Sequence, residues 1–171
     1  MMAFYIGTIS LFLIDLFDFN TQELGTFLFV VGVFLSFNQA VLSKFFVKKF
    51  GEFRTLLIGL TFCALGLIAI NLTTNLYVFI GFYYIMNLGL SLCFPTFNAL
   101  ISMHADPKKQ GEIMGISEAI NSFAMALFPV ISAYLYDLFG FGLYFFISAL
   151  PAFALLLAIL KLRKVGAAAL D

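Results

Sequence analysis

Charged residues are scarce in this chain. Of its 171 residues only 11% are Asp, Glu, Lys or Arg, whereas 63% are hydrophobic. Soluble domains are about 25% charged and about 45–50% apolar, so a single water-facing core cannot bury these side chains. Intrinsic disorder is excluded as well, because disordered segments combine low hydrophobicity with high charge. The formal net charge is zero, which gives no electrostatic basis for a nucleic-acid partner.

Residues that hold metals or perform catalysis are also few. The two cysteines, Cys63 and Cys93, lie inside apolar runs and are interpreted as small buried hydrophobic residues. The one histidine, His104, stands near Asp106 without other metal ligands nearby, so we expect it in a turn. We find no nucleophile elbow, no phosphate-binding glycine loop and no metal-binding pair of acids at helical spacing. The sequence therefore predicts no cofactor, no metal site and no enzyme.

Long apolar runs are what the chain has in abundance. A membrane-spanning helix needs about 20 such residues, and continuous runs differ from the alternating strands of a membrane barrel. The sequence therefore predicts an all-α integral membrane protein with six spans: Met1–Phe17, Leu24–Phe46, Thr55–Ile70, Leu76–Met103, Ile113–Leu138 and Leu143–Leu160. The first run is short and has no basic residue before it, which argues against a cleaved secretory signal. We expect the beginning of that first helix to be missing.

Basic residues set the predicted orientation. All nine Lys and Arg residues surround the second turn, lie in the fourth turn or follow the sixth run, and none falls in residues 18–23, 71–75 or 139–142. Six crossings put every one of these positive charges on a single face, which the positive-inside rule makes cytoplasmic. We expect both termini in the cytoplasm, residues 161–171 as a cytoplasmic tail, and the chain in the cytoplasmic (inner) membrane.

Polar and small residues recur on one face of four predicted helices. Positions three and four apart share a helix face, and a polar stripe marks a buried or hydrated side, since polar groups are costly in hydrocarbon. The third and sixth helices lack such stripes. This period of three predicts two three-helix units with the third helix of each toward lipid, as in secondary transporters with internal repeats. The stripes comprise Tyr5, Thr8 and Asp15; Gly25, Gly32, Ser36, Gln39 and Ser43; Tyr84, Asn87, Ser91, Asn98 and Ser102; and Glu118, Asn121 and Ser122 beside Gly111, Gly115 and Ala119.

Several of these features have two interpretations. Glu118 lies well inside a run, where an acid costs about 2.5 kcal/mol or more; it is either a proton-coupling or cation-recognising carboxylate or a near-interface acid paired with Lys or Arg. Asp15 is either functional or a solvated helix-end acid. The polar residues of the fourth helix either bind substrate or form interhelical hydrogen bonds, worth about 0.6 kcal/mol each. The Gly111 and Gly115 pair favours helix packing.

Two cytoplasmic turns resemble those of a known family. Lys48-Lys49-Phe50-Gly51-Glu52-Phe53-Arg54 is similar to the helix 8–9 turn of the major facilitator superfamily, especially its drug:proton antiporters of the tetracycline-efflux type. The stretch Asp106-Pro107-Lys108-Lys109-Gln110-Gly111, continuing to Gly115, resembles the helix 10–11 region of that family. The resemblance implies that residues 1–171 are the C-terminal half, helices 7–12, of a twelve-helix fold. One departure is Phe128-Pro129, where the family has glycine-proline.

The resemblance also implies a function. We expect proton-coupled export of a small lipophilic compound, with Glu118 as the proton carrier and a lone half inactive until it pairs with an N-terminal half or with a second copy of itself. The alternative is a non-transporting remnant or a membrane scaffold that assembles with another protein. The predicted partners are the lipid bilayer and the small-molecule substrate. The substrate-binding candidates are Tyr5, Thr8, Gln39, Tyr84, Asn87, Ser91, Asn98 and Asn121.

Overall fold

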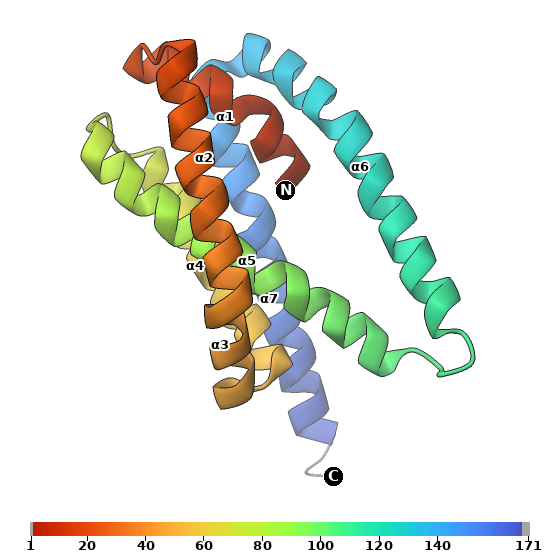
Figure 1. Cartoon of the computed structure of the whole chain (residues 1–171). Helices are drawn as coiled ribbons and strands as arrows, with labels where there is room; N and C mark the ends of the chain where they lie inside the picture. Colours follow the sequence, from red (N-terminus) through yellow and green to blue (C-terminus); the bar gives the residue numbers. More distant parts are fainter. Residues whose placement is uncertain (1, 169–171) are drawn as a thin grey trace.

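The computed structural model describes residues 2–168, with side chains described for residues 8–140, 142, 146, 147 and 149–159. Every regular element in this part of the chain is helical, which confirms the predicted all-α class. The elements are α1 (Met2–Phe17), α2 (Thr21–Phe37), the π-helical η1 (Asn38–Leu42), α3 (Ser43–Phe50), α4 (Glu52–Ile70), α5 (Leu76–His104), α6 (Gln110–Phe139), the 3₁₀ turn η2 (Gly140–Gly142) and α7 (Leu143–Ala168). Figure 1 shows an elongated bundle with α6 along its edge.

α2, η1 and α3 form one continuous helix, Thr21–Phe50. Its start is fixed by a capping box, in which the Glu23 N–H donates to the Asn20 side chain at 2.9 Å and the Asn20 N–H donates to the Glu23 carboxylate at 3.0 Å. In η1 the backbone widens, so that the N–H of Ser43 donates to the carbonyl of Asn38, five residues earlier. The helix ends at Phe50, and Gly51 follows it with a φ of 78°, which is accessible because glycine has no Cβ.

Four helices are long and apolar enough to cross a bilayer, judged by length and composition: Thr21–Phe50, Glu52–Ile70, Leu76–His104 and Gln110–Phe139. Within the described residues α1 and α7 contribute shorter apolar stretches, Thr8–Phe17 and Ala149–Ile159. The membrane class is therefore supported, and the count of six spans stays a prediction.

The most extensive packing joins α4 to α5. A Cβ built on Gly66 would lie 2.6 Å from the Cβ of Met86, and one built on Gly89 would lie 2.6 Å from the backbone oxygen of Gly59. Only small residues permit this approach, as at many helix interfaces in membranes. Cys63 is fully buried in the same seam, and its thiol donates to the carbonyl of Met86 at 3.7 Å. The small residues of α4 therefore face α5.

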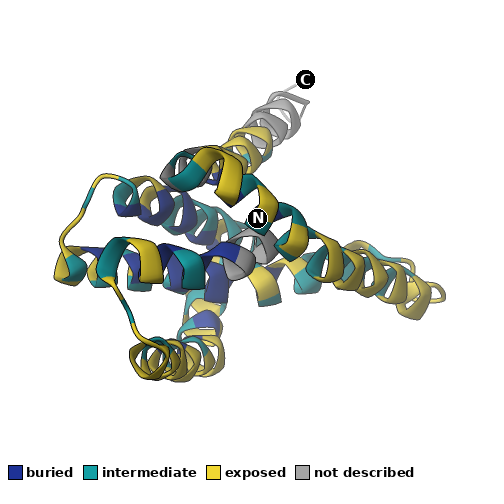
Figure 2. Ribbon diagram, turned by 90° about the horizontal axis from the view of Figure 1, so that it is seen from above, coloured by how far each residue is buried: buried dark blue, intermediate teal, exposed yellow. Residues whose placement is uncertain are grey.

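α6 is attached to the bundle near one end. Its two buried residues, Ser132 and Tyr136, lie toward its C-terminus, and its main neighbour is α1. There Tyr136 joins the hydrophobic core cluster that contains Phe12 and Leu13 of α1. Figure 2 shows buried ribbon in the middle of the bundle and exposed ribbon at its margins. The remainder of α6 belongs to this exposed margin, because no residue from position 110 to 131 is fully buried.

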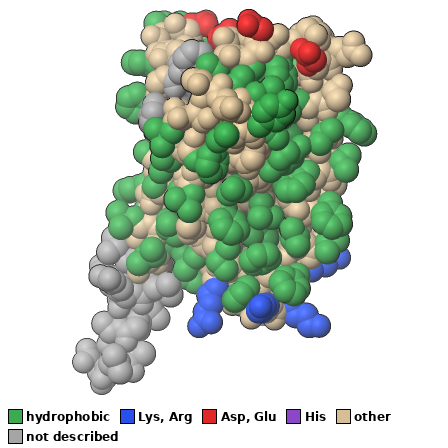
Figure 3. Space-filling view, turned by 90° about the vertical axis from the view of Figure 1, so that its left-hand side faces the viewer, with side chains coloured by type: hydrophobic (Ala, Val, Ile, Leu, Met, Phe, Trp, Pro, Cys, Tyr) green, Lys and Arg blue, Asp and Glu red, His purple; other side chains and the backbone are tan. Residues whose placement is uncertain are grey.

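One face of the bundle carries opposite charges at its two ends. On the face drawn in Figure 3, Asp and Glu side chains gather at one end, Lys and Arg side chains at the other, and hydrophobic side chains cover the area between them. The described basic residues come from α3, the start of α4 and the α5–α6 turn: Lys44, Lys48, Lys49, Arg54, Lys108 and Lys109. An apolar belt between charged ends is typical of a helical membrane protein.

Candidate functional site

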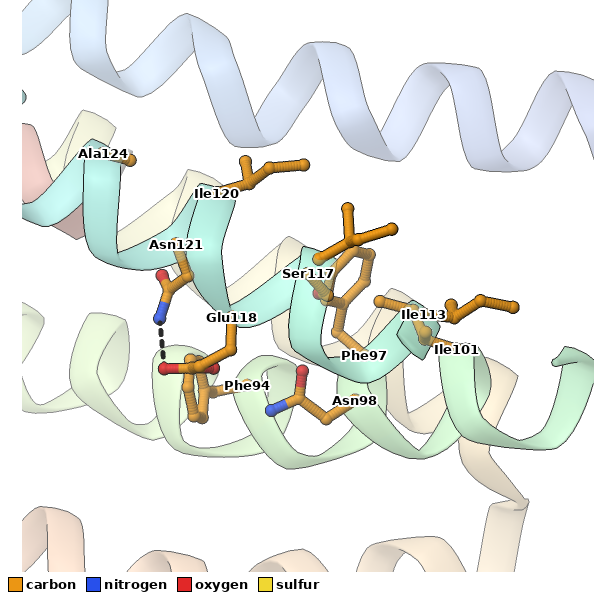
Figure 4. A pocket seen from close by; sticks show the side chains of 11 residues that line it. Phe94, Phe97, Asn98, Ile101, Ile113, Ser117, Glu118, Ile120, Asn121 and Ala124 are labelled. Atoms are coloured by element: carbon orange, nitrogen blue, oxygen red, sulfur yellow. Dashed lines mark hydrogen bonds between the residues drawn. The ribbon is translucent and has the colours of Figure 1, made fainter. Parts of the chain in front are cut away.

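A cavity of about 610 Å³ lies between α5 and α6. Ligand pockets typically measure about 300–1,000 Å³. The lining comprises Phe94, Phe97, Asn98 and Ile101 of α5, and Ile113, Ile116, Ser117, Glu118, Ile120, Asn121 and Ala124 of α6. Figure 4 shows the lining side chains on the two helices. Three residues of the predicted polar stripes, Asn98, Glu118 and Asn121, are thus brought together.

Helical spacing explains why these residues meet. On α5, Phe94, Asn98 and Ile101 are four and three positions apart and therefore share one face. On α6 the lining residues recur at similar intervals between positions 113 and 124. Pro95 lies inside α5 at the same level, where it removes one backbone hydrogen bond of the helix. The cavity is formed by two matched helix faces at this level.

The polar side chains of the cavity form a small cluster. The amide of Asn121 donates to Oε1 of Glu118 at 3.4 Å, and Figure 4 shows both side chains pointing from α6 toward α5, which carries Asn98. Glu118 is exposed, whereas Asn98 and Asn121 are half-buried. A carboxylate accepts hydrogen bonds or a proton, and an amide both donates and accepts. The cluster can therefore hold a proton or orient a polar group of a ligand.

Glu118 is the one charged residue among the lining residues. No Lys or Arg side chain in the described part of the chain pairs with it; its hydrogen-bond partner is Asn121. The other walls are mainly aromatic and aliphatic. Among the described residues no cluster of His, Cys, Asp and Glu is arranged to hold a metal ion.

Thr8, Asn87 and Ser91 lie elsewhere, inside the packed bundle. All three are at most 1% exposed. The amide of Asn87 donates to the carbonyl of Tyr83 at 2.8 Å, and the hydroxyl of Ser91 donates to the carbonyl of Leu88 at 2.7 Å. Both bonds stay within α5, so these two side chains are satisfied without a ligand and without a second helix.

Gln39 and Tyr84 are also separate from the cavity. Gln39 is exposed within η1. Tyr84 is half-buried, and its ring packs edge-on against that of Phe34 in α2, with 4.7 Å between centroids. The side chain of Tyr5 falls outside the described residues. Of the seven substrate-binding candidates with described side chains, two, Asn98 and Asn121, reach the cavity.

The predicted turn residues between α3 and α4 occupy helix ends. Lys48 and Lys49 lie in the last turn of α3, where cations interact favourably with the helix dipole. The ammonium of Lys49 lies 5.3 Å from the ring centroid of Phe50, within the range of a cation–π contact. Gly51 forms the turn, and Arg54 is exposed in the first turn of α4.

The turn between α5 and α6 leads into residues of the second predicted motif. Gln110 begins α6, and its amide donates to the hydroxyl of Ser102 on α5. Within the described part of the chain, the face predicted to pack at Gly111 and Gly115 has no neighbour, because a Cβ on either glycine meets nothing within 4 Å. Among the described residues no helix packs closely on α6 at this end, so its small residues face open space. Packing of this face therefore stays a prediction.

Two features of the structure have no clear sign in the sequence. The first is the aromatic lining of the cavity, Phe94 and Phe97. Because the 24 phenylalanines are spread over all runs, the sequence does not single these two out, except that Phe94 lies one turn before Asn98 of the polar stripe. Asn38, at the start of η1, is fully buried, and neither its side-chain oxygen nor its nitrogen has a hydrogen-bond partner. The π turn interrupts the 3.6-residue period from which burial is predicted.

Apolar helices of spanning length, an apolar belt between charged ends, and an apolar cavity with one carboxylate define a multi-pass helical membrane protein. Comparison with protein families matches residues 1–169 to the Major Facilitator Superfamily. The chain belongs to this family, whose members are transporters and not enzymes. The match confirms the family resemblance of the two turns.

Individual relatives are distant and longer. The tetracycline resistance protein, class H, of Pasteurella multocida is 25% identical over 121 residues, which cover 71% of this chain and 30% of that protein. The Hippocampus abundant transcript 1 proteins of Mus musculus and Homo sapiens are each 23% identical over 129 residues, 75% of this chain and 26% of theirs. The matches thus span less than a third of each relative. No solved structure matches the chain significantly.

Proposed function

We propose that this chain forms the C-terminal six-helix half of a secondary active transporter, and that the α5–α6 cavity serves proton-coupled export of a small lipophilic compound. The observation that carries the proposal is the meeting of Asn98, Glu118 and Asn121 in one largely apolar cavity. Family membership supports transport. The name of one relative, a tetracycline resistance protein, supports a drug-like organic substrate.

Glu118 is the proton carrier in this proposal. When ionised, it is the one negative charge among the lining residues and accepts a hydrogen bond from Asn121. When protonated, the carboxyl group is neutral and becomes a donor. A proton and a donor group of the substrate therefore compete for the same oxygens. Such competition is a negative coupling between two ligands, and antiport requires it.

A second six-helix half completes the proposed transporter. Alternating access requires two bundles that move around a site between them, and a lone half would leave the polar side of its cavity facing lipid, which is costly. The second half is an N-terminal bundle, on the same or a separate chain, or else a second copy of this chain. The present chain lies in the cytoplasmic membrane with its basic end toward the cytoplasm, following the positive-inside rule.

Transport by inverted membrane vesicles tests the role of Glu118. The vesicles come from cells that make the protein at its own locus, and accumulation of tetracycline is followed after a proton gradient is imposed. Glu118→Gln is expected to abolish gradient-driven accumulation, because the amide keeps the size of the side chain but does not carry a proton. Glu112→Gln is the matched control on the same helix, since Glu112 is exposed and lies outside the cavity lining. Gradient-driven transport that persists in Glu118→Gln contradicts the proposed coupling.

The size of the native product tests the half-transporter state. A C-terminal tag at the native locus and a blot of the membrane fraction give the apparent mass. A band near 19.0 kDa supports a separately made half, and native gels then distinguish a second copy from another partner. A band about twice as large indicates a continuous twelve-helix chain. Absence of a band favours a non-transporting remnant.

A further inference from the structure

We propose that the hydrogen bond between Asp15 of α1 and Tyr136 of α6 is an anchor that positions the cavity-lining part of α6. The Tyr136 hydroxyl donates to Oδ2 of Asp15 at 3.0 Å, and the two residues are 121 positions apart in the chain. The role of the cavity rests on the proposed function, whereas the anchor concerns only the position of α6, which can be measured without measuring transport. It therefore has a test of its own.

Tyr136 is well placed to act as an anchor. The residue is 6% exposed and belongs to the same core cluster as Phe12 and Leu13 of α1. Hydrogen bonds to an ionised carboxylate are roughly twice as strong as those between neutral groups. The ring therefore fixes the position of the helix end, while the hydroxyl, held by Asp15, fixes its rotation. Asp15 is exposed at the end of α1, as expected for a solvated helix-end acid, but it also has a specific partner in Tyr136.

Apart from the short turn to α5 and the hydrogen bond from Gln110 to Ser102 at its start, the cavity-lining part of α6 has few other attachments. No residue from position 110 to 131 is fully buried, whereas Ser132 and Tyr136 are. Pro129 separates these two parts of the helix, and a proline inside a helix removes a backbone hydrogen bond and favours a kink there. The anchored end and the cavity-lining segment therefore lie on opposite sides of a weak point.

The distance along α6 connects the anchor to the cavity. Glu118 precedes Tyr136 by about 27 Å along the helix, at a rise of about 1.5 Å per residue. A small tilt of the anchored end becomes a larger displacement at Glu118, and bending at Pro129 adds to it. Loss of the Asp15–Tyr136 bond should therefore widen the range of distances between α5 and the first half of α6.

Spin-label distances in the full chain, reconstituted in lipid nanodiscs, measure this range. One label is attached through Met103→Cys on α5 and the other through Phe123→Cys on α6. Both sites are exposed, at 64% and 68%, and neither lines the cavity. Cys93 is replaced by alanine, and Cys63 is left in place because it is fully buried. The anchored protein should give one main distance.

Removing either partner of the bond should broaden this distribution. Tyr136→Phe deletes the hydroxyl and keeps the ring; Asp15→Ala deletes the acceptor at an exposed helix end, so it remains informative if Tyr136→Phe fails to fold. The double variant should be no broader than the single ones, because both remove the same interaction. Asp15→Asn retains an acceptor oxygen and should restore the main distance. Tyr134→Phe, at a 66% exposed site two residues earlier, is the control and should change nothing.

Two results would overturn the anchor: a distribution that stays narrow in Asp15→Ala, or equal broadening in Tyr134→Phe and Tyr136→Phe. Glu118→Gln keeps this test apart from the proposed function. It should leave the distance distribution unchanged whatever it does to transport. Failure of the anchor in this test therefore leaves the proposed role of Glu118 intact. Transport by Glu118→Gln would likewise leave the anchor intact.

Discussion

Replacing Gly89 by alanine tests how closely α4 and α5 approach each other. The added Cβ would lie 2.6 Å from the backbone nitrogen of Cys63, 2.6 Å from the backbone oxygen of Gly59 and 2.8 Å from the Cys63 sulfur. Ordinary van der Waals contact begins at 3.4 Å, about 0.8 Å farther than the two backbone atoms. Rotation of a side chain cannot relieve a clash with backbone, so the two helices must separate.

The magnitude follows from two opposing terms. Overpacking costs about 1–3 kcal/mol, and the upper part of that range applies because backbone must move. Alanine is favoured over glycine inside a helix by about 0.5–1 kcal/mol. We therefore expect the free energy of unfolding to fall by about 1–2 kcal/mol, which lowers the ratio of folded to unfolded protein roughly 5- to 30-fold.

Gly81→Ala is the matched control for this prediction. Gly81 lies on the same helix, and a Cβ built there meets nothing within 4 Å, so its variant should gain only the helix-propensity term. Titration of both purified variants with sodium dodecyl sulfate in mixed micelles, followed by circular dichroism, compares their unfolding. If Gly89→Ala is as stable as Gly81→Ala, the close approach of α4 and α5 is refuted.

Three further predictions use the same titration. Gly51→Ala should cost about 1–3 kcal/mol, because a φ of 78° with a ψ of 165° is a conformation essentially restricted to glycine; Gly25→Ala, in open space on α2, should not be destabilised. Asn20→Ala should cost about 1 kcal/mol through loss of the capping box, and faster hydrogen exchange confined to the first turn of α2 would identify the cause. Asn38→Leu should stabilise the protein by about 1–3 kcal/mol, since it removes a buried amide without partners; a destabilised variant would refute this reasoning.

Helix positions are predictable from this sequence because apolar length and charge act locally. The run predicted from Leu76 to Met103 becomes α5, which ends one residue later. The cavity is predictable only in part, and α5 shows why. Asn87, Ser91 and Asn98 share a face, but the first two lie in the packed core and the third lines the cavity. A stripe identifies a side of a helix, and a helix of 29 residues meets different neighbours along one side.

Pairings between distant helices leave no such local pattern. Nothing near Asp15 or Tyr136 in the sequence connects the two residues, since neither spacing nor composition relates positions 121 residues apart. The open space beside Gly111 has the same origin. Small residues allow a close approach, but the position of α6 as a whole determines whether another helix packs on this face.

The π turn η1 has a consequence for insertions and deletions. Its hydrogen bond from Ser43 to Asn38 closes a turn that holds one residue more than an α-helical turn. Deleting one residue between Gln39 and Leu42 would therefore restore ordinary helix and leave α2 and α3 in their present mutual orientation. The same deletion farther up α2 would turn every following side chain by about 100° around the axis, at about 3.6 residues per turn. Natural variation in the length of this helix should accordingly be confined to η1, and appear as a single-residue gap when homologous chains are aligned.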